Sequence, residues 1–319
     1  MNSFPKVELH VHLDGSVDVK TASEILKEDY KYLQYQMSLK STCENLNEYL
    51  TKFDIPVKIM NSKKNLERIA YELTVNLKND GVIYAEVRFA PLKHITPDMN
   101  MYEVVESVIM GLNRLGLKTN LILCMMRGTE LKENQKVIDL AHHYLNKGVC
   151  AVDLAGAESL YKTSDYKDLF LYAKEKEVPF TIHAGEADGP DSIAAAISFG
   201  AKRIGHGIRI IESNELIEVV KEKDILLEIC PTSNIQTKVV SKIKNHPIKD
   251  LYLKGVKVSI NTDNRTVSNT TLTREYILLR DNLGFTTKDF IEMNKEAIKH
   301  SFLSEEEKEK LLKKFNSLL

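Results

Sequence analysis

Residues 121–126, Leu121-Ile122-Leu123-Cys124-Met125-Met126, form the clearest strand signal in the chain, an unbroken run of apolar side chains. Such a run is typical of a strand that is buried on both faces of a parallel sheet. Similar short apolar runs recur along the chain and are separated by amphipathic helical stretches. The expected strands span residues 7–12, 84–89, 121–126, 151–155, 180–183, 203–205, 226–230 and 257–261.

Eight strands that alternate with helices predict an α/β fold of the (β/α)8 TIM-barrel type. The first connection, residues 14–81, is long enough for several additional helices, whereas the later connections are about one helix long. Long insertions after barrel strands lie over the C-terminal face of the barrel, where active sites form. We therefore expect residues 15–60 to form a lid. Two smaller α/β domains are the alternative to one domain over residues 1–319, but the candidate site described below joins both ends of the chain.

Two helix boundaries follow from capping signals. Ser62 precedes a long helical stretch with an apolar face that includes Leu66, and Gly81 lies just beyond its end. Ser304 and Glu307 have the spacing of a capping box, and an amphipathic segment follows them. Both signals predict where a helix begins.

The charge balance argues against a polyanionic partner or a membrane. Lys and Arg number 44 against 45 Asp and Glu, and no basic run is long enough to follow a phosphate backbone. The longest uncharged stretch, residues 192–201, is far shorter than the roughly 20 residues of a membrane helix. The four cysteines are scattered along the sequence, which predicts that they stay reduced. Residues 1–6 lack the apolar core of a signal peptide, so we expect a cytoplasmic protein.

The strongest chemical feature is residues 8–15, Glu-Leu-His-Val-His-Leu-Asp-Gly, at the end of the first expected strand. Residues two apart on a strand point to the same face. His10 and His12 can therefore present two imidazoles to the mouth of a barrel as metal ligands. Because His-x-His is common, two histidines held in ordinary hydrogen bonds are the alternative.

Further candidate ligands lie at the ends of later strands. His183 ends the fifth strand and Glu186 follows it, His206 ends the sixth, and Asp263 follows the eighth. The competing explanation is a chance placement of these groups at one face of the barrel. The remaining histidines lie in expected helices or loops, where a surface or packing role is the simpler interpretation: His94, His142, His143, His246 and His300.

Three histidines and an aspartate around a zinc ion leave one coordination position for water. Zinc lowers the pKa of that water and supplies hydroxide as a nucleophile near neutral pH. A carboxylic acid beside the metal, the place of Glu186, is the natural proton donor to a substrate. The pattern predicts metal-assisted hydrolysis at an electrophilic carbon.

Five motifs, in this order, resemble those of the adenosine deaminase family of the amidohydrolase superfamily. They are His-Val-His-Leu-Asp-Gly (10–15), Asp-Leu-Ala-Gly (153–156), His-Ala-Gly-Glu (183–186), Gly-His-Gly (205–207) and Asn-Thr-Asp-Asn (261–264). Residues 302–308 also resemble the C-terminal segment of that family, so the resemblance spans essentially the whole chain. It implies deamination of adenosine, and of 2′-deoxyadenosine, to inosine or deoxyinosine plus ammonia in purine salvage. We expect a small purine nucleoside as partner, and a monomer or weak homo-oligomer.

The resemblance also implies roles for the matched residues. One zinc ion per chain would be held by His10, His12, His183 and Asp263. Asp263 would also take a proton from the bound water, His206 would stabilise the developing oxyanion, and Glu186 would protonate N1 while hydroxide attacks C6.

The remaining matched residues would surround the nucleoside. His12 would lie beside the substrate, Asp14 would reach the ribose 5′-hydroxyl, and the Gly156 N–H would meet N3. Asp153 would support the metal site from behind. Binuclear members of the superfamily carry a modified lysine at the position of Asp153, so a single metal is favoured.

Asn264 departs from the family pattern, which usually has a second aspartate that contacts N7 of the purine. An amide can donate to N7 directly. The departure leaves a modified adenosine or free adenine as alternative substrates. A more distant alternative is a metal-dependent phosphoesterase, a class of enzyme that also begins with His-x-His. Another is a non-catalytic relative that only binds a nucleoside. In the lid, Phe53, Ile55, Pro56 and Val57 are either an apolar wall over the purine or lid core.

Overall fold

The computed structural model describes residues 4–43 and 46–316, so half of the N-terminal stretch examined for a signal peptide lies outside it. Its strands form two parallel four-stranded sheets, ordered β1-β2-β3-β4 and β5-β6-β7-β8. They are β1 (Lys6–His12), β2 (Val82–Phe89), β3 (Lys118–Met126), β4 (Val149–Ala155), β5 (Ile182–Ala184), β6 (Arg203–His206), β7 (Leu226–Ile229) and β8 (Lys257–Ile260). Parallel bridges from Val11 to Asp263 and from Val152 to Phe180 join the two sheets. The sheet is therefore closed, and the predicted TIM barrel is confirmed.

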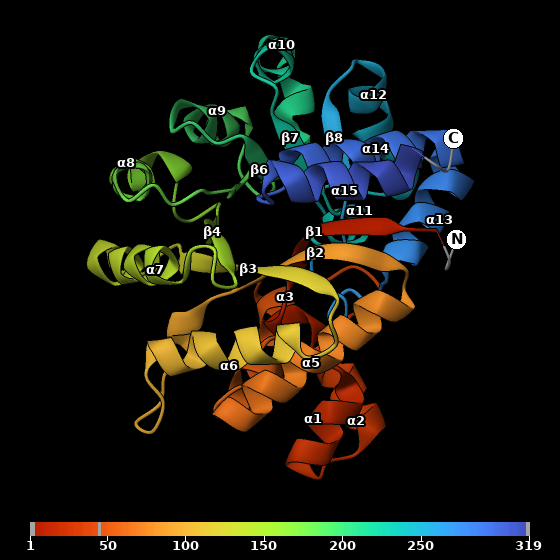
Figure 1. Ribbon diagram of the computed structural model, residues 1–319. Helices are drawn as coiled ribbons and strands as arrows, with labels where there is room; N and C mark the ends of the chain where they lie inside the picture. Colours follow the sequence, from red (N-terminus) through yellow and green to blue (C-terminus); the bar gives the residue numbers. More distant parts are fainter. Residues whose placement is uncertain (1–3, 44–45, 317–319) are drawn as a thin grey trace.

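Helices surround the barrel (Figure 1). Within the described residues the first eight are α1 (Val19–Leu26), α2 (Tyr30–Met37), α3 (Leu46–Thr51), α4 (Asp54–Ile59), α5 (Lys63–Asn79), α6 (Met101–Asn113), α7 (Leu131–Tyr144) and α8 (Lys167–Glu175). The others are α9 (Pro190–Ser198), α10 (Asn214–Glu222), α11 (Pro231–Gln236), α12 (Ile248–Leu253), α13 (Leu272–Leu283), α14 (Thr287–His300) and α15 (Glu305–Asn316). A large hydrophobic core lies between the strands and these helices.

The long first connection contains four short helices, α1 to α4, before the long helix α5, so the several additional helices predicted there are present. Backbone hydrogen bonds tie this segment to the C-terminal half of the barrel, two of them from the lid beyond α2. The Leu39 N–H donates to the Val267 carbonyl at 2.8 Å, and the Cys43 N–H donates to the Gln236 carbonyl at 3.1 Å. The lid is therefore anchored to the loop after β8 and to the end of α11.

Both predicted capping signals are present. The Ser62 hydroxyl accepts the Asn65 N–H at the start of α5. At the start of α15, the Ser304 hydroxyl donates to the Glu307 carboxylate at 2.9 Å, and the Glu307 N–H donates back to the hydroxyl at 3.4 Å. Each cap satisfies backbone donors that have no partner inside the helix.

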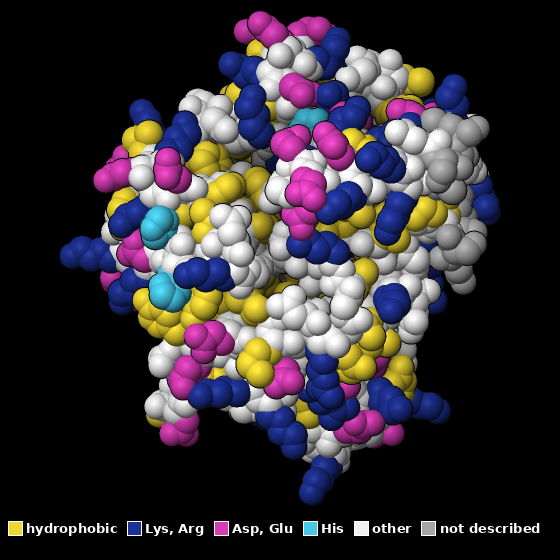
Figure 2. Space-filling model, in the orientation of Figure 1, with side chains coloured by type: hydrophobic (Ala, Val, Ile, Leu, Met, Phe, Trp, Pro, Cys, Tyr) yellow, Lys and Arg dark blue, Asp and Glu magenta, His cyan; other side chains and the backbone are white. Residues whose placement is uncertain are grey.

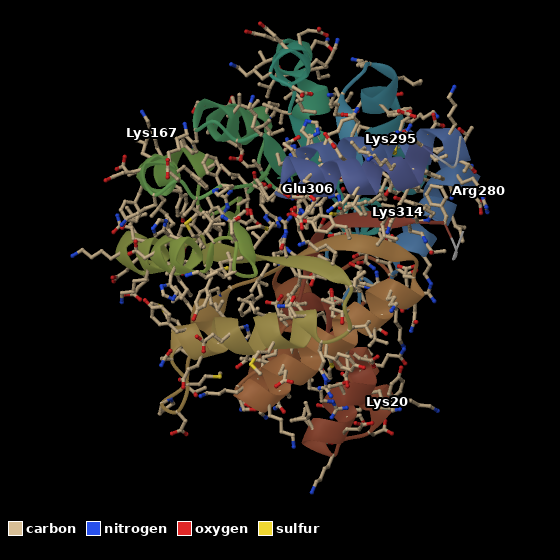
Figure 3. The ribbon with its side chains drawn as sticks, in the orientation of Figure 1. Lys20, Lys167, Arg280, Lys295, Glu306 and Lys314 are labelled. Atoms are coloured by element: carbon tan, nitrogen blue, oxygen red, sulfur yellow. The ribbon has the colours of Figure 1, made fainter. Side chains whose placement is uncertain are left out.

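The outer surface is charged and mixed in sign. Figure 2 shows Lys and Arg interspersed with Asp and Glu on the visible face, with apolar side chains gathered between them. Charged side chains of the outer helices, such as Lys167 and Arg280, point away from the barrel (Figure 3). Among residues 4–43 and 46–316, none of the helices has the length and apolar character needed to span a membrane.

Candidate metal centre and active site

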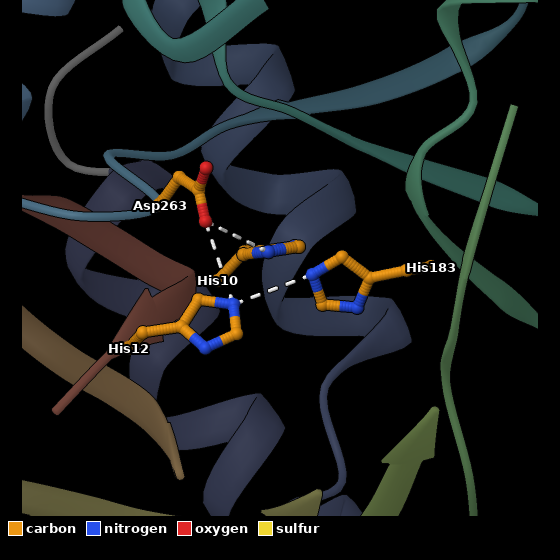
Figure 4. Close-up of side chains that lie close together, drawn as sticks. All are labelled: His10, His12, His183 and Asp263. Atoms are coloured by element: carbon orange, nitrogen blue, oxygen red, sulfur yellow. Dashed lines mark hydrogen bonds and ion pairs between the residues drawn. The ribbon is translucent and has the colours of Figure 1, made fainter. Parts of the chain in front are cut away.

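Four side chains converge at the face of the barrel where the strands have their carboxyl ends (Figure 4). His10 and His12 come from β1, His183 lies in β5, and Asp263 follows β8. Asp263 Oδ1 lies 3.5 Å from His10 Nε2 and 3.4 Å from His12 Nε2. His12 Nε2 lies 3.3 Å from His183 Nε2. All four candidate ligand atoms lie within 4.8 Å of one another.

These residues fit a zinc ion. His10 Nε2 is buried and has no hydrogen-bond partner among the described residues, so its lone pair is available to a cation. Burial lowers the pKa of His10 to about 4, which keeps the imidazole neutral, as metal ligation requires. Three imidazoles and a carboxylate are a donor set that suits zinc.

A buried carboxylate faces the outer nitrogen of two of these histidines. Glu228 Oε2 lies 2.9 Å from His10 Nδ1, and Asp153 Oδ2 lies 2.8 Å from His183 Nδ1. Glu228 can accept the Nδ1 proton of His10, and the negative charge of Asp153 favours a proton on His183 Nδ1, so each ring presents the lone pair of Nε2 to the centre. The sequence predicts Asp153 in this position, but Glu228 was missed.

Arg88 links the two carboxylates beneath the centre. Its guanidinium donates to Asp153 Oδ2 and to Glu228 Oε2, each at 2.8 Å, and all three side chains are fully buried. Burial opposes ionisation of Asp153, but the adjacent His183 ring and the Arg88 guanidinium hold its pKa well below the ordinary value. A charged residue within an apolar strand, as in Leu226-Leu227-Glu228-Ile229, is the sequence signal that could have found Glu228 and Arg88.

Glu186 and His206 lie beside the four candidate ligands. Glu186 Oε2 is 3.6 Å from His206 Nε2. Burial raises the pKa of Glu186, and the nearby charge of Asp263 adds to that rise. A raised pKa favours the protonated carboxyl, which is the form that can donate a proton.

The backbone at two of these positions is unusual. His206 and Asp263 both have left-handed backbone, with φ of 61° and 59°. Such conformations cost free energy for residues other than glycine, and they cluster at functional sites. His206 is the last residue of β6 and Asp263 follows β8, so both conformations occur where the chain leaves a strand at the barrel mouth.

Another buried carboxylate, that of Glu158, organises the loop that carries Glu186. Glu158 accepts four backbone N–H groups, those of residues 185, 186, 187 and 188, at 2.6, 3.0, 2.7 and 3.1 Å. Its Oε1 also accepts the Ser192 hydroxyl at 2.5 Å. The sequence around Glu158 carries no sign of this role, because its hydrogen-bond partners lie in the next strand–helix connection.

A cavity of about 1110 Å³ opens above the centre. Its lining includes every residue that the sequence assigns to substrate contact: His12, Asp14, Gly156 and Asn264. From the lid it is lined by Tyr49, Phe53 and Val57. The sequence leaves open whether four lid residues form a wall of the pocket or the core of the lid. Phe53 and Val57 line the cavity, whereas Pro56 is buried and Ile55 packs against the main core.

Asn264 is held between the lid and the turn after β1. Its Nδ2 donates to the Tyr49 hydroxyl at 2.8 Å, while its Oδ1 is buried without a partner among the described residues. A Cβ added to Gly15 would lie 1.8 Å from Asn264 Oδ1, so only glycine fits there. The amide is therefore fixed at the cavity wall, with one Nδ2 hydrogen still available.

Known proteins with similar sequences belong to the family that the strand-end motifs resemble. The family model described as adenosine deaminase matches residues 5–318. The adenosine deaminase of Clostridium acetobutylicum is 40% identical, over 98% of this chain and 98% of its own. That of Clostridium botulinum strain Loch Maree is 42% identical, over 97% of this chain and 96% of its own.

Solved structures show the same fold. The apo N6-methyl-AMP deaminase from Arabidopsis thaliana is 29% identical and superposes with a TM-score of 0.86, covering 99% of this chain and 97% of that one. The adenine deaminase from Arthrobacter aurescens, 22% identical, superposes with a TM-score of 0.89 over 98% of each chain. The family match over nearly the whole length, together with the barrel and its strand-end histidines, shows that this chain belongs to the adenosine deaminase family.

Proposed function

We propose that this chain is a zinc-dependent enzyme that hydrolyses adenosine, and 2′-deoxyadenosine, to inosine or deoxyinosine and ammonia. The observation that carries the proposal is the half-buried Glu186 carboxyl, 3.6 Å from His206, beside three histidines and an aspartate with zinc-binding chemistry. His10, His12, His183 and Asp263 would hold one ion. When bound, the zinc would lower the pKa of a water molecule and so supply a nucleophile near neutral pH.

The chain's own residues would divide the proton transfers. Glu186, whose pKa is raised mainly by burial, would donate a proton to N1 of the purine and so make C6 electrophilic. Asp263, whose pKa the surrounding histidines hold well below the ordinary value despite burial, would take the proton from the attacking water. His206 would stabilise the charge that develops on the attacking oxygen.

The cavity wall supplies the groups that would orient a nucleoside. The Gly156 N–H would meet N3 and the remaining Nδ2 hydrogen of Asn264 would meet N7. Asp14 would accept the ribose 5′-hydroxyl. A carboxylate in that position repels a 5′-phosphate, which favours a nucleoside over a nucleotide.

A substrate panel tests the proposal. The conversion of adenosine, 2′-deoxyadenosine, adenine and N6-methyl-AMP is followed by the ultraviolet change from aminopurine to hydroxypurine. Adenosine is expected to have the highest kcat/KM, with about one equivalent of zinc per chain. A higher value for adenine or N6-methyl-AMP would reject the assigned substrate, and two metals per chain would reject the mononuclear centre. If 7-deazaadenosine reacts as well as adenosine, the Asn264 contact is wrong.

A further inference from the structure

A chain of buried hydrogen bonds leads from the backbone of α12 to His206. The Ile248 N–H donates to His246 Nδ1 at 3.2 Å. His246 Nε2 lies 3.3 Å from Asn234 Oδ1, and Asn234 Nδ2 lies 3.0 Å from His206 Nδ1. The exposed fractions of His246, Asn234 and His206 are 3%, 0% and 1%, so each side chain is shielded from water.

The direction of every bond in this chain follows from its first donor. A backbone N–H can only donate, so His246 Nδ1 must accept and the proton of the neutral ring must be on Nε2. Burial lowers the pKa of His246 to about 3, so the ring is neutral at working pH. His246 Nε2–H therefore donates to Asn234 Oδ1, and the Asn234 amide donates to His206 Nδ1.

The opposite orientation of the Asn234 amide is excluded by the same bonds. If the amide were rotated, its NH₂ group would face the Nε2–H of His246, and two donors would meet in a buried site. A buried donor left without an acceptor costs about 1–3 kcal/mol. The amide is thus locked, and His206 must carry its proton on Nε2.

His206 therefore has the opposite tautomer from His10 and His183. Those two rings face carboxylates through Nδ1 and present a lone pair at Nε2. His206 faces an amide donor through Nδ1 and presents an N–H at Nε2 instead. A neutral ring in this state can neither ligate a metal through Nε2 nor accept a proton there.

We infer that Asn234 and His246 are positioning residues that hold His206 as the Nε2–H tautomer. His206 then acts as a hydrogen-bond donor to the oxygen that develops charge, and the role of base is left to another group. The inference rests on the proposed function for the identity of that oxygen. The tautomer itself rests only on the hydrogen-bond chain.

Nitrogen NMR of the zinc-loaded chain, labelled with ¹⁵N-histidine, reads the tautomer directly. We expect an unprotonated Nδ1 and a protonated Nε2 for both His206 and His246. Asn234→Asp places a carboxylate, which only accepts, between the two rings. The His206 proton should then move to Nδ1, and kcat for adenosine should fall about 100-fold or more, as for loss of an oxyanion donor. KM should change much less than kcat.

Asn245→Asp is the matched control, because Asn245 is exposed and lies next to His246 in the sequence. It should keep both the nitrogen pattern and the activity. A wild-type His206 with its proton on Nδ1 would overturn the inference, whether or not Asn234→Asp folds. So would a folded Asn234→Asp protein with an unchanged nitrogen pattern. If the wild type fails to deaminate adenosine, the proposed function falls, but the nitrogen pattern still decides the tautomer.

Discussion

Tyr49 and Asn264 meet at the cavity wall, and this contact joins the lid to the loop after β8. The Tyr49 hydroxyl accepts an Asn264 Nδ2 hydrogen at 2.8 Å, and Tyr49 is buried. With one amide hydrogen held by Tyr49, the other has a fixed direction. The orientation that would recognise N7 of a purine thus depends on a residue of the lid.

Tyr49→Phe should raise KM for adenosine about 2- to 10-fold, the worth of one hydrogen bond, with a smaller effect on kcat. The variant should also discriminate less between adenosine and 7-deazaadenosine, because the amide loses its fixed direction. Steady-state kinetics with both substrates measure these effects. Tyr30→Phe, at an exposed position in α2, is the control that should behave as wild type. Equal KM values for Tyr49→Phe and wild type would show that the contact does not orient the amide.

Glu186→Gln keeps the shape of the proposed donor but removes its acidic proton. We expect kcat to fall by about 10²- to 10⁴-fold, the usual contribution of general acid catalysis. The zinc content should not change, because Glu186 is not among the four candidate ligands. Kinetics and metal analysis on the same sample separate the two effects. Glu215→Gln, exposed at the start of α10, is the control. An active Glu186→Gln enzyme would remove Glu186 from the mechanism.

At the scale of elements, the conformation of the loop after β5 depends on a residue outside that loop. Four consecutive N–H groups, those of residues 185–188, converge on Glu158, which follows β4. Such a nest of amides is satisfied by a carboxylate, and it holds the backbone on either side of Glu186 in one conformation. The position of the proposed proton donor therefore depends on the neighbouring strand–helix connection.

Glu158→Gln should lower stability by about 1–3 kcal/mol, because an NH₂ group would face backbone donors. It should also shift the alkaline limb of the kcat profile to lower pH. Burial is the main cause of the raised pKa of Glu186, but the negative charge of Glu158 contributes to it. Removing that charge lowers the pKa, so Glu186 loses its proton at lower pH. Thermal unfolding and a pH–kcat profile measure both, with the exposed Glu175→Gln as control. An unshifted alkaline limb would contradict this coupling.

The elements that sequence predicts well are those with local signals. All eight strands were found from apolar runs, and α5 and α15 from their capping serines. The start of β3 was missed, because polar residues 118–120 are strand only through pairing with residues 84–86 of β2. Strand alternation placed His10 and His12, since their geometry is local. His246 was assigned to surface or packing, because its partner Asn234 is brought to it only by the fold.

At the scale of the whole molecule, buried charges replace the branched apolar side chains that usually fill a barrel of this type. Arg203 contacts Glu228 at 2.7 Å and also pairs with Glu86. Its guanidinium also lies over the Phe302 ring, 4.3 Å from the centroid, where the C-terminal segment meets the barrel. With Arg88, this network connects strands from both sheets and supports the histidines above it. Through His10 and His183, the network links the candidate metal centre to the barrel interior.

Arg88→Met should therefore damage both stability and metal binding. Two buried carboxylates would lose their shared cation, and breaking such a network costs about 3–5 kcal/mol at neutral pH. Zinc affinity should fall about 10- to 100-fold, because the carboxylates behind His10 and His183 lose their fixed positions. Chemical denaturation and zinc titration of the same protein measure the two losses.

The pH dependence separates a lost charge from lost packing. Burial alone would raise the pKa of Asp153 and Glu228, but the charges around them hold the pKa of each carboxyl well below its ordinary value. The ionised carboxylates therefore stabilise the folded state at neutral pH, and this stabilisation is lost on acidification. The difference in unfolding free energy between wild type and Arg88→Met should therefore shrink as the pH falls. Arg280→Met removes a half-exposed arginine from a surface pair and should leave the free energy of unfolding almost unchanged at every pH. A loss for Arg88→Met that stays constant with pH would point to packing alone and contradict the electrostatic role of the network.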